Sequence, residues 1–342
     1  FSTMPEKMNV AVVGPDTLVG EALVQLLEER EFPLDWLVLL GEEGAAGRRV
    51  EFRGSHLRIE PAVSFDFAQV RVAFFCAGAH MAEALAPRAA AAGAVVIDSS
   101  PKFRDAADVP LVVAEVNADD IAGFAARNLI SSPSCGSIAL AVALKPLQDV
   151  AGLTRINAVT FQAVSGGGRN AVEELARQTA NLLNVRPVES GMFPKQIAFN
   201  LLPQVDAFQD NGFTGEEMKL MHELRRVLHA PDLGVNATAV RVPVFFGHSV
   251  AVHLETRDRL GAAEARRLLE SAAGVEVLDV HEPGGYPTPV TEAAGQDPVW
   301  VGRLREDLSH PRGLDLWVVT ENIRRQALNC VQIAEQLAKN LS

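Results

Sequence analysis

Cysteine is scarce in this sequence of 342 residues, and the three cysteines that occur are widely separated. Cys76, Cys135 and Cys330 match neither the dense pattern of a disulfide-stapled secreted domain nor the spacing of a zinc site. We therefore expect no bound metal, and we expect reduced thiols in a cytoplasmic protein.

Positive charge is scarce relative to negative charge. The sequence has 31 lysines and arginines against 43 aspartates and glutamates, which gives a formal net charge of −12. Phosphate backbones and anionic lipids repel such a protein, so neither nucleic acid nor a membrane surface is an expected partner. Long apolar runs are absent too, because segments such as 138–144 are too short to span a bilayer. The first ten residues carry no apolar signal core.

The first half of the sequence alternates strand and helix patterns, and its length suits two domains. Strand candidates are 9–14, 36–41, 70–78 and 94–100. Helix candidates are 18–30, with its leucines on one face, and the alanine-rich 81–93. Strands separated by helices predict an α/β domain with a Rossmann-like, doubly wound parallel sheet covered on both faces.

The second half changes character. Long strand patterns at 153–165 and 236–255 are separated by helix patterns at about 170–184 and 214–228, and a helix–strand pair follows at 262–280. This order predicts an α+β domain on a mixed or antiparallel sheet.

The segment "GPDTLVG" lies between a predicted strand and a predicted helix. Gly14 occupies the position of a turn glycine and Gly20 that of a helix-packing glycine in a dinucleotide-binding turn. Thr17 stands where such a turn usually has its middle glycine. The motif alone leaves both nucleotide binding and ordinary loop chemistry open.

Cys135 lies in "SPSCGS", just before a nearly all-apolar segment. A thiol at a helix N-terminus has its thiolate stabilised by the helix dipole and by unpaired N–H groups. A buried core cysteine is the alternative, and it fits Cys76 and Cys330 better because both lie inside apolar patterns.

The segment "VRVPVFFGHS" carries two further candidate residues. Arg241 and His248 interrupt its apolar run, and a bend at Pro243 and Gly247 would let both side chains reach one cleft. The alternative is an edge-strand salt bridge and a turn histidine.

Charged residues in two other segments have a similar pair of interpretations. In "GEEMK", Glu216 and Lys219 share a helix face, and in "PKFR", Lys102 and Arg104 follow a strand. Anion binding and ordinary surface charge are both open for these groups.

Together these motifs resemble the aspartate-semialdehyde dehydrogenase family, and the resemblance runs from about Asn9 to the C-terminal helix. The matching segments are VVGxxxLVG, VVIDSSxxFR, PSCGSIALAVALKPL, FQAVSGGGRNAVEEL, AFNLLPQVD, GEEMKLMHELRRVL, AVRVPVFFGHSVAV and VWVGRLREDLS. The domains expected are a dinucleotide-binding domain at 1–134, completed by a C-terminal helix at 322–342, and a substrate-binding and dimerisation domain at 135–321.

The resemblance implies a reaction and assigns its residues. Cys135 attacks an acyl phosphate such as aspartyl phosphate to form a thioester and release phosphate, and hydride from NADPH then reduces the thioester to the semialdehyde. His248 matches the acid/base histidine and Gln162 the glutamine that orients the substrate. Arg241 matches the arginine that holds the substrate carboxylate, and Glu216 the acid that holds its amine. Arg104 and Lys219 match the phosphate-binding pair. A homodimer is also implied.

Departures from the family pattern cluster at the cofactor positions. The Gly-Ala-Thr-Gly turn reads "GPDT", and Glu42 and Gly44 replace a serine and an arginine that grip the 2′-phosphate of NADP. Glu42 would repel that phosphate and accept a ribose hydroxyl, which favours NAD over NADP. The expected cofactor-binding residues are Gly14, Thr17, Leu18, Val19, Gly20, Glu42, Gly78, Ser165, Gly166 and Asn322.

These departures at the cofactor positions resemble those of a paralogous branch of the family that is called USG-1-like. Two hypotheses follow: an active semialdehyde dehydrogenase, or a non-catalytic paralog that keeps a ligand pocket in a regulatory role. An enzyme of the N-acetyl-glutamyl-phosphate reductase type is a further alternative, although the "RVPVFFGHS" and "EEMK" segments favour an aspartyl substrate.

Overall fold

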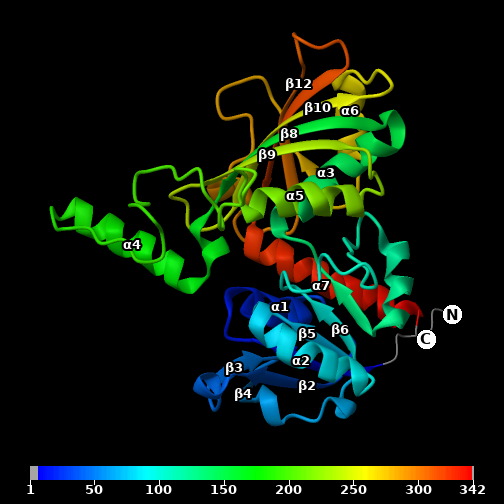
Figure 1. The fold of residues 1–342 in the computed structure, drawn as a ribbon, viewed down its shortest axis with the longest axis vertical. Helices are drawn as coiled ribbons and strands as arrows, with labels where there is room; N and C mark the ends of the chain where they lie inside the picture. Colours follow the sequence, from blue (N-terminus) through cyan, green and yellow to red (C-terminus); the bar gives the residue numbers. More distant parts are fainter. Residues whose placement is uncertain (1–6, 341–342) are drawn as a thin grey trace. The chain divides into compact units, whose positions relative to one another are not determined.

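The computed structural model describes residues 7–340, and positions 1–6 and 341–342 of the expected domains lie outside the described residues (Figure 1). Within that range the chain forms two compact units. One comprises the residues up to Ser134 and those from Gln326 onward, and the other is Cys135–Arg325. No helix in the described range has the length and apolar character needed to cross a membrane.

The first unit is built on a seven-stranded sheet with the order β3-β4-β2-β1-β5-β6-β7. Its strands are β1 (Met8–Val13), β2 (Leu34–Gly41), β3 (Arg49–Phe52), β4 (Ser55–Pro61), β5 (Val72–Phe75), β6 (Val95–Asp98) and β7 (Leu129–Ser131). Its helices are α1 (Leu18–Glu29), α2 (Ala79–Ala91) and the greater part of α7 (Asn322–Asn340). All pairings are parallel except β3 with β4.

Two apolar clusters cover the two faces of this sheet. Residues of α1 and α7 pack on one face, with Leu23, Leu27 and Val331 fully buried, and residues of α2 pack on the other. The strands are buried on both faces, which explains their continuous apolar sequences. The predicted doubly wound fold is therefore confirmed.

The second unit is built on a six-stranded sheet with the order β11-β12-β13-β10-β8-β9. Its strands are β8 (Leu153–Gln162), β9 (Gly234–Arg241), β10 (His248–Thr256), β11 (Val275–Val277), β12 (Val299–Glu306) and β13 (Gly313–Thr320). Its helices are α3 (Cys135–Ala151), α4 (Arg169–Leu183), α5 (Gly215–Val227) and α6 (Ala262–Glu270). The β8–β9 and β11–β12 pairs are parallel and the others antiparallel, so the sheet is mixed.

The structure corrects one feature of the sequence interpretation. The pattern at 236–255 is not one long strand but two strands, β9 and β10, which flank β8 on its opposite sides. The break falls where a bend was expected: Pro243 has no N–H to donate to a ladder, and Gly247 has a φ of +97°. A Cβ at Gly247 would lie 2.5 Å from Cβ of Pro289, so the chain turns there in a conformation that only glycine allows.

Candidate active site

His248 and Arg241 are joined through the backbone of one residue, Ala163. The Ala163 N–H donates a hydrogen bond to Nδ1 of His248 (3.1 Å), and Nη1 of Arg241 donates to the carbonyl oxygen of Ala163 (2.7 Å). Ala163 directly follows β8, Arg241 ends β9 and His248 begins β10. The three strands are neighbours in the sheet, which is why residues far apart in sequence meet here.

Gly166 lies directly against these two side chains. A Cβ at this position would approach Nη1 of Arg241 to 2.9 Å and Nε2 of His248 to 3.4 Å, so only glycine leaves the imidazole and the guanidinium in place. Next to it, Asn322 hydrogen-bonds with the Ser165 hydroxyl and accepts a bond from the N–H of Gly247 (2.8 Å). The structure thus brings three of the expected cofactor-binding residues to the histidine.

Glu216 and Gln162 meet in the same unit. The Gln162 amide donates to Oε1 of Glu216 (3.2 Å) and to the Thr160 hydroxyl (3.2 Å). Lys219, one turn along α5, forms an ion pair with Asp206 (2.6 Å). Asp206 was not expected at the site, because its segment carries no motif apart from the family match.

The electrostatics of the site follow from burial. Burial first, and the Arg241 charge second, lower the pKa of His248 to about 3. Burial also lowers the pKa of Arg241, while the Glu216 carboxylate opposes that shift. His248 is therefore a neutral imidazole at neutral pH, and because its Nδ1 accepts the Ala163 N–H, its proton is on Nε2.

Cys135 is the first residue of α3 and is partly exposed. The preceding loop is held within the first unit by α7, where Gln326 donates to the Pro133 carbonyl and Asn329 to the Ser132 hydroxyl. The other two cysteines differ sharply. Cys76 and Cys330 are buried, and burial raises the pKa of the first thiol well above its ordinary value and that of the second to about 12.

Arg104 and Lys102 have different environments in the first unit. Arg104 is buried and donates to the carbonyl oxygens of Ser132 and Ser99, whereas Lys102 forms a surface ion pair with Glu83. Of the two cations in this segment, only Arg104 is therefore built into the structure beside the loop that leads to Cys135.

The residues of the glycine turn fit a dinucleotide. Gly14 has a φ of +85°, and a Cβ there would lie 2.7 Å from Cβ of Ala77, while a Cβ at Gly20 would overlap the Gly14 carbonyl oxygen. Thr17 caps α1 by accepting from the Gly20 N–H (3.0 Å). In the first turn of α1, the N–H groups of Leu18 and Val19 have no acceptor within the helix, so they suit a phosphate.

Two other residues complete the expected cofactor region. Gly78 is the N-cap of α2, with a φ of +85° and open space where a Cβ would stand. Glu42 directly follows β2 and is exposed, beside the strand that carries the Gly14 turn. A carboxylate at this position suits a ribose hydroxyl and repels a phosphate.

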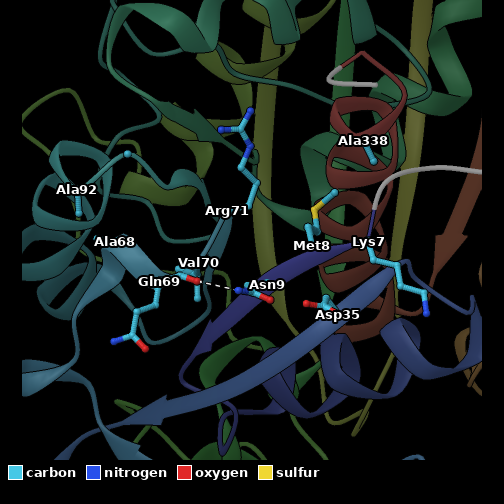
Figure 2. A pocket seen from close by; sticks show the side chains of 11 residues that line it. Lys7, Met8, Asn9, Asp35, Ala68, Gln69, Val70, Arg71, Ala92 and Ala338 are labelled. Carbon is cyan, nitrogen blue, oxygen red and sulfur yellow. Dashed lines mark hydrogen bonds between the residues drawn. The ribbon is translucent and has the colours of Figure 1, made fainter.

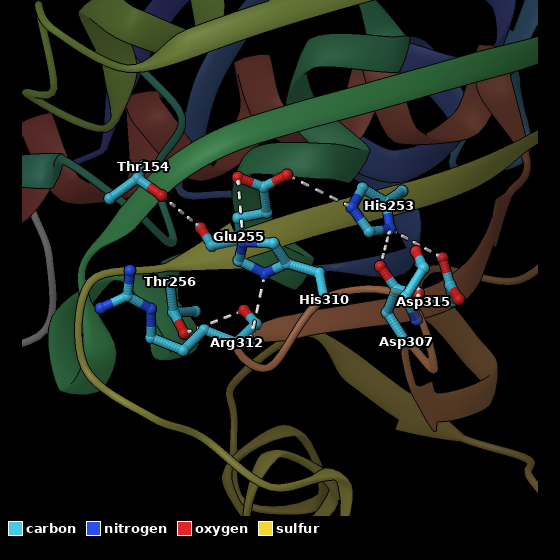
Figure 3. Close-up of polar contacts among 9 residues, drawn as sticks. Thr154, His253, Glu255, Thr256, Asp307, His310, Arg312 and Asp315 are labelled. Atoms are coloured by element: carbon cyan, nitrogen blue, oxygen red, sulfur yellow. Dashed lines mark hydrogen bonds and ion pairs between the residues drawn. The ribbon is translucent and has the colours of Figure 1, made fainter.

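Each unit has one further feature that lies away from the residues described so far. A cavity of about 550 Å³ opens at the amino ends of β1 and β5, the opposite end of the sheet from the Gly14 turn, and Lys7, Asn9 and Arg71 are among its lining residues (Figure 2). In the second unit, His253 contacts Asp315 (3.1 Å) within a cluster of half-buried carboxylates and histidines (Figure 3). Among the described residues, no group of three or more His, Cys, Asp or Glu is placed to hold a metal ion.

The fold and the site define a class: a two-unit α/β protein with a glycine turn of the dinucleotide-binding kind in one unit and a hydrogen-bonded cluster of buried polar side chains in the other. Two family models match the chain. They are described as "Semialdehyde dehydrogenase, NAD binding domain", over residues 9–124, and "Semialdehyde dehydrogenase, dimerisation domain", over residues 144–325.

Relatives match over nearly the whole chain. It is 48% identical to the aspartate-semialdehyde dehydrogenase of Shewanella violacea over 98% of this chain and 99% of that protein, and 42% identical to that of Bacillus subtilis with the same coverage. The crystal structure of aspartate semialdehyde dehydrogenase II from Vibrio cholerae, complexed with ASA, superposes with a TM-score of 0.96 at 46% identity over 98% of this chain and all of that one. The chain belongs to the aspartate-semialdehyde dehydrogenase family, as the motifs predicted. Membership of the USG-1-like branch stays a prediction.

Proposed function

We propose that this protein is an NAD(P)-dependent aspartate-semialdehyde dehydrogenase. The observation that carries the proposal is the cluster in the second unit: His248 and Arg241 are hydrogen-bonded to the backbone of Ala163, and Gln162 is hydrogen-bonded to Glu216. The names of the full-length relatives favour this function over a non-catalytic paralog.

The two charged residues of the cluster suit the two ends of an α-amino acid. The guanidinium of Arg241 is a planar fork that pairs with a carboxylate, and the carboxylate of Glu216 pairs with an ammonium group. Gln162, which is hydrogen-bonded to Glu216, is the residue proposed to orient the acyl group on the side chain of that amino acid. Lys219 and Arg104 are the cations proposed for phosphate.

Cys135 is the proposed nucleophile. In the biosynthetic direction its thiolate sulfur forms a bond to the acyl carbon of aspartyl phosphate, and the C–O bond to phosphate breaks with its electron pair leaving on phosphate. The N-terminus of α3 stabilises the thiolate through the helix dipole. When bound, a reduced nicotinamide cofactor supplies the hydride that converts the resulting thioester to the aldehyde.

His248 donates a hydrogen bond from a defined atom. The Ala163 N–H fixes Nδ1 as an acceptor, so the neutral imidazole donates from Nε2. A hydrogen-bond donor of this kind stabilises the oxygen on which charge develops during attack by the thiolate, while the imidazole keeps its proton and the sulfur later departs as the thiolate. The low pKa of His248 keeps this protonation state constant across the neutral range.

The proposed cofactor is NAD in preference to NADP. The backbone of the Gly14 turn supports a pyrophosphate, while the Glu42 carboxylate opposes a 2′-phosphate. The measurement is thermal stability against nucleotide concentration: a ligand at 100 times its dissociation constant stabilises by roughly 2.7 kcal/mol. NAD is expected to stabilise the protein at lower concentration than NADP, and a protein that responds to neither nucleotide would refute this assignment.

A homodimer is the proposed assembly, formed through the face of the second sheet that lies opposite α3. Val159, Ala251 and Trp317 form one cross-strand row on this face, and Val159 is 37% exposed. Helix α4 projects from the same unit and is followed by the exposed side chains of Val185 and Phe199 (Figure 1). A charge in the row, Val159→Glu, should lower the mass measured by light scattering from two chains to one. A wild-type monomer at micromolar concentration would contradict the proposal.

The function itself is tested by an assay of the reverse reaction. The wild-type protein is mixed with aspartate semialdehyde, phosphate and NAD or NADP, and reduced nicotinamide is followed by its absorbance. We expect turnover that depends on phosphate. Turnover with neither nucleotide, in protein shown to be folded, would exclude the dehydrogenase function.

A further inference from the structure

Glu217 is the neighbour of Glu216 in the sequence, but its carboxylate has a different environment. It is buried, with 6% of its surface exposed, and both of its oxygens accept backbone hydrogen bonds. Oε2 accepts from the N–H of Thr214 (2.8 Å), at the start of α5, and Oε1 accepts from the N–H of Ala239 (2.9 Å), in β9. One carboxylate thus ties a helix end to a strand.

The two elements that Glu217 joins carry the two proposed anchors of the substrate. Glu216, the proposed partner of the substrate ammonium, is the second residue of α5. Arg241, the proposed partner of the substrate carboxylate, lies two residues beyond Ala239 on β9. Because the ammonium and carboxylate of an α-amino acid are a fixed distance apart, recognition needs a fixed separation of these anchors.

The outer edge of β9 makes one of the contacts that set this separation, through the N–H of Ala239. Strand β9 is the edge of its sheet, so on its outer side the Ala239 N–H has no neighbouring strand and is satisfied by Glu217. The Arg241 N–H is satisfied on that edge by the Leu202 carbonyl (2.8 Å), which belongs to the loop after α4 and not to α5. The contact between Glu217 and Ala239 is therefore a direct link between the strand of Arg241 and the helix of Glu216.

We propose that Glu217 is a positioning residue that sets the distance between the two substrate anchors, and so gives the enzyme its selectivity for aldehydes that carry an α-amino group. Glu217 does not touch the substrate. It acts by holding the first turn of α5 against β9. The inference rests on the proposed function, since it assigns Glu216 and Arg241 to the two ends of the substrate.

The test compares two aldehydes and two variants. Aspartate semialdehyde carries the amino group, and succinate semialdehyde lacks it but keeps the carboxylate and the aldehyde. Glu217→Gln has a single acceptor oxygen and therefore satisfies only one of the two N–H groups. Thr214→Ala is the matched control: it removes the other half of the capping box, the bond from the Glu217 N–H to the Thr214 hydroxyl (3.4 Å), but leaves both acceptor bonds of Glu217.

The readout is the ratio of kcat/KM for the two aldehydes, with the melting temperature measured alongside it. We expect Glu217→Gln to lower the ratio by about tenfold, mainly through a higher KM for aspartate semialdehyde, the size expected when one hydrogen-bonded contact is lost. Glu217→Asp, which keeps two oxygens on a shorter side chain, should recover part of the ratio. Thr214→Ala should lower the melting temperature and leave the ratio unchanged.

The experiment distinguishes failure of the role of Glu217 from failure of the proposed function. An active wild-type protein with an unchanged ratio in Glu217→Gln, or with an equal change in Thr214→Ala, would overturn the role of Glu217 and leave the proposed function standing. A folded wild-type protein that oxidises neither aldehyde would refute the proposed function, and this inference with it.

Discussion

The two units recognise their proposed ligands by different means. In the second unit, recognition depends on side chains whose positions are fixed by buried contacts, such as those of Arg241 and His248 with the backbone of Ala163. In the first unit, the Gly14 turn presents backbone N–H groups, and its geometry depends on small residues at Gly14 and Gly20. A backbone site tolerates side-chain replacement around it, whereas a side-chain site does not. The departures from the family pattern at the cofactor positions therefore predict altered cofactor choice and not the loss of the site.

The largest expected effect is at the nucleophile. Cys135→Ser should lower kcat for phosphate-dependent oxidation of aspartate semialdehyde by at least roughly 10³-fold. The reason is that a serine hydroxyl stays protonated in a site where a cysteine thiol ionises to the nucleophilic thiolate. The control is alkylation by iodoacetamide followed by mass spectrometry: Cys135 should be modified first, since Cys76 and Cys330 are buried with raised pKa values. Full activity in the serine variant would exclude Cys135 as the nucleophile.

A pair of glycine substitutions separates the two kinds of site. Gly166→Ala should lower kcat/KM by about 10²-fold, because the new Cβ displaces Arg241 and His248. Gly166 is itself an expected cofactor-binding residue, so some loss of nucleotide binding is expected, but a smaller one than in Gly14→Ala. Gly14→Ala should instead abolish nucleotide-induced stabilisation, since its φ of +85° and the contact with Ala77 exclude a side chain. Equal loss of nucleotide binding in both variants would contradict the division between the units.

Cofactor choice should respond to one side chain. Glu42→Ser removes the carboxylate that opposes a 2′-phosphate, so the apparent affinity for NADP should rise by about tenfold while that for NAD falls slightly. Thermal-shift titrations with the two nucleotides measure both changes. Unchanged NADP binding in this variant would show that Glu42 does not face the adenosine ribose.

The smallest expected effect is in the pH dependence of stability, and the two units should contribute with opposite sign. The pKa of His248 is about 3 in the folded protein, below its usual 6.5, so its contribution to stability is lost as pH falls from 6.5 toward 3. Burial raises the pKa of Asp98, in the first unit, to about 6 from 3.8, so its contribution is lost as pH rises between those values.

The histidine contribution is measured by comparing melting temperatures of the wild type and His248→Gln between pH 7 and pH 4. Because the wild type loses of the order of 1 kcal/mol per pH unit below 6.5 from this group, its melting temperature should fall more steeply than that of the variant. Parallel curves for the two proteins would show that His248 is not buried in the neutral form.

The fold could be predicted from the sequence because each helix or strand has its own pattern of hydrophobic residues. Buried strands such as 9–14 and the amphipathic helix at 18–30 are local patterns, and their alternation defines a doubly wound sheet. The division of 236–255 into β9 and β10 was not predictable in register: Pro243 and Gly247 signal a bend, but nothing local says that β8 lies between the two strands.

The candidate residues of the site were found through motifs, and their contacts were not. Ala163 takes part through its backbone, so its side chain gives no signal in the sequence. The Lys219–Asp206 ion pair joins a helix to a loop 13 residues earlier, and charge spacing on the helix predicts only contacts within that helix. Glu217 reads as half of a capping box, and only the tertiary structure reveals its second bond to Ala239.

The most direct test of the whole account is a burst measurement without phosphate. The protein is mixed with aspartate semialdehyde and saturating NAD, and reduced nicotinamide is followed on the millisecond scale. We predict a burst of one reduced nicotinamide per chain, because oxidation of the aldehyde leaves a thioester on Cys135 that phosphate must release, followed by sustained turnover once phosphate is added. The absence of a burst in folded protein that binds NAD would contradict thioester formation at Cys135.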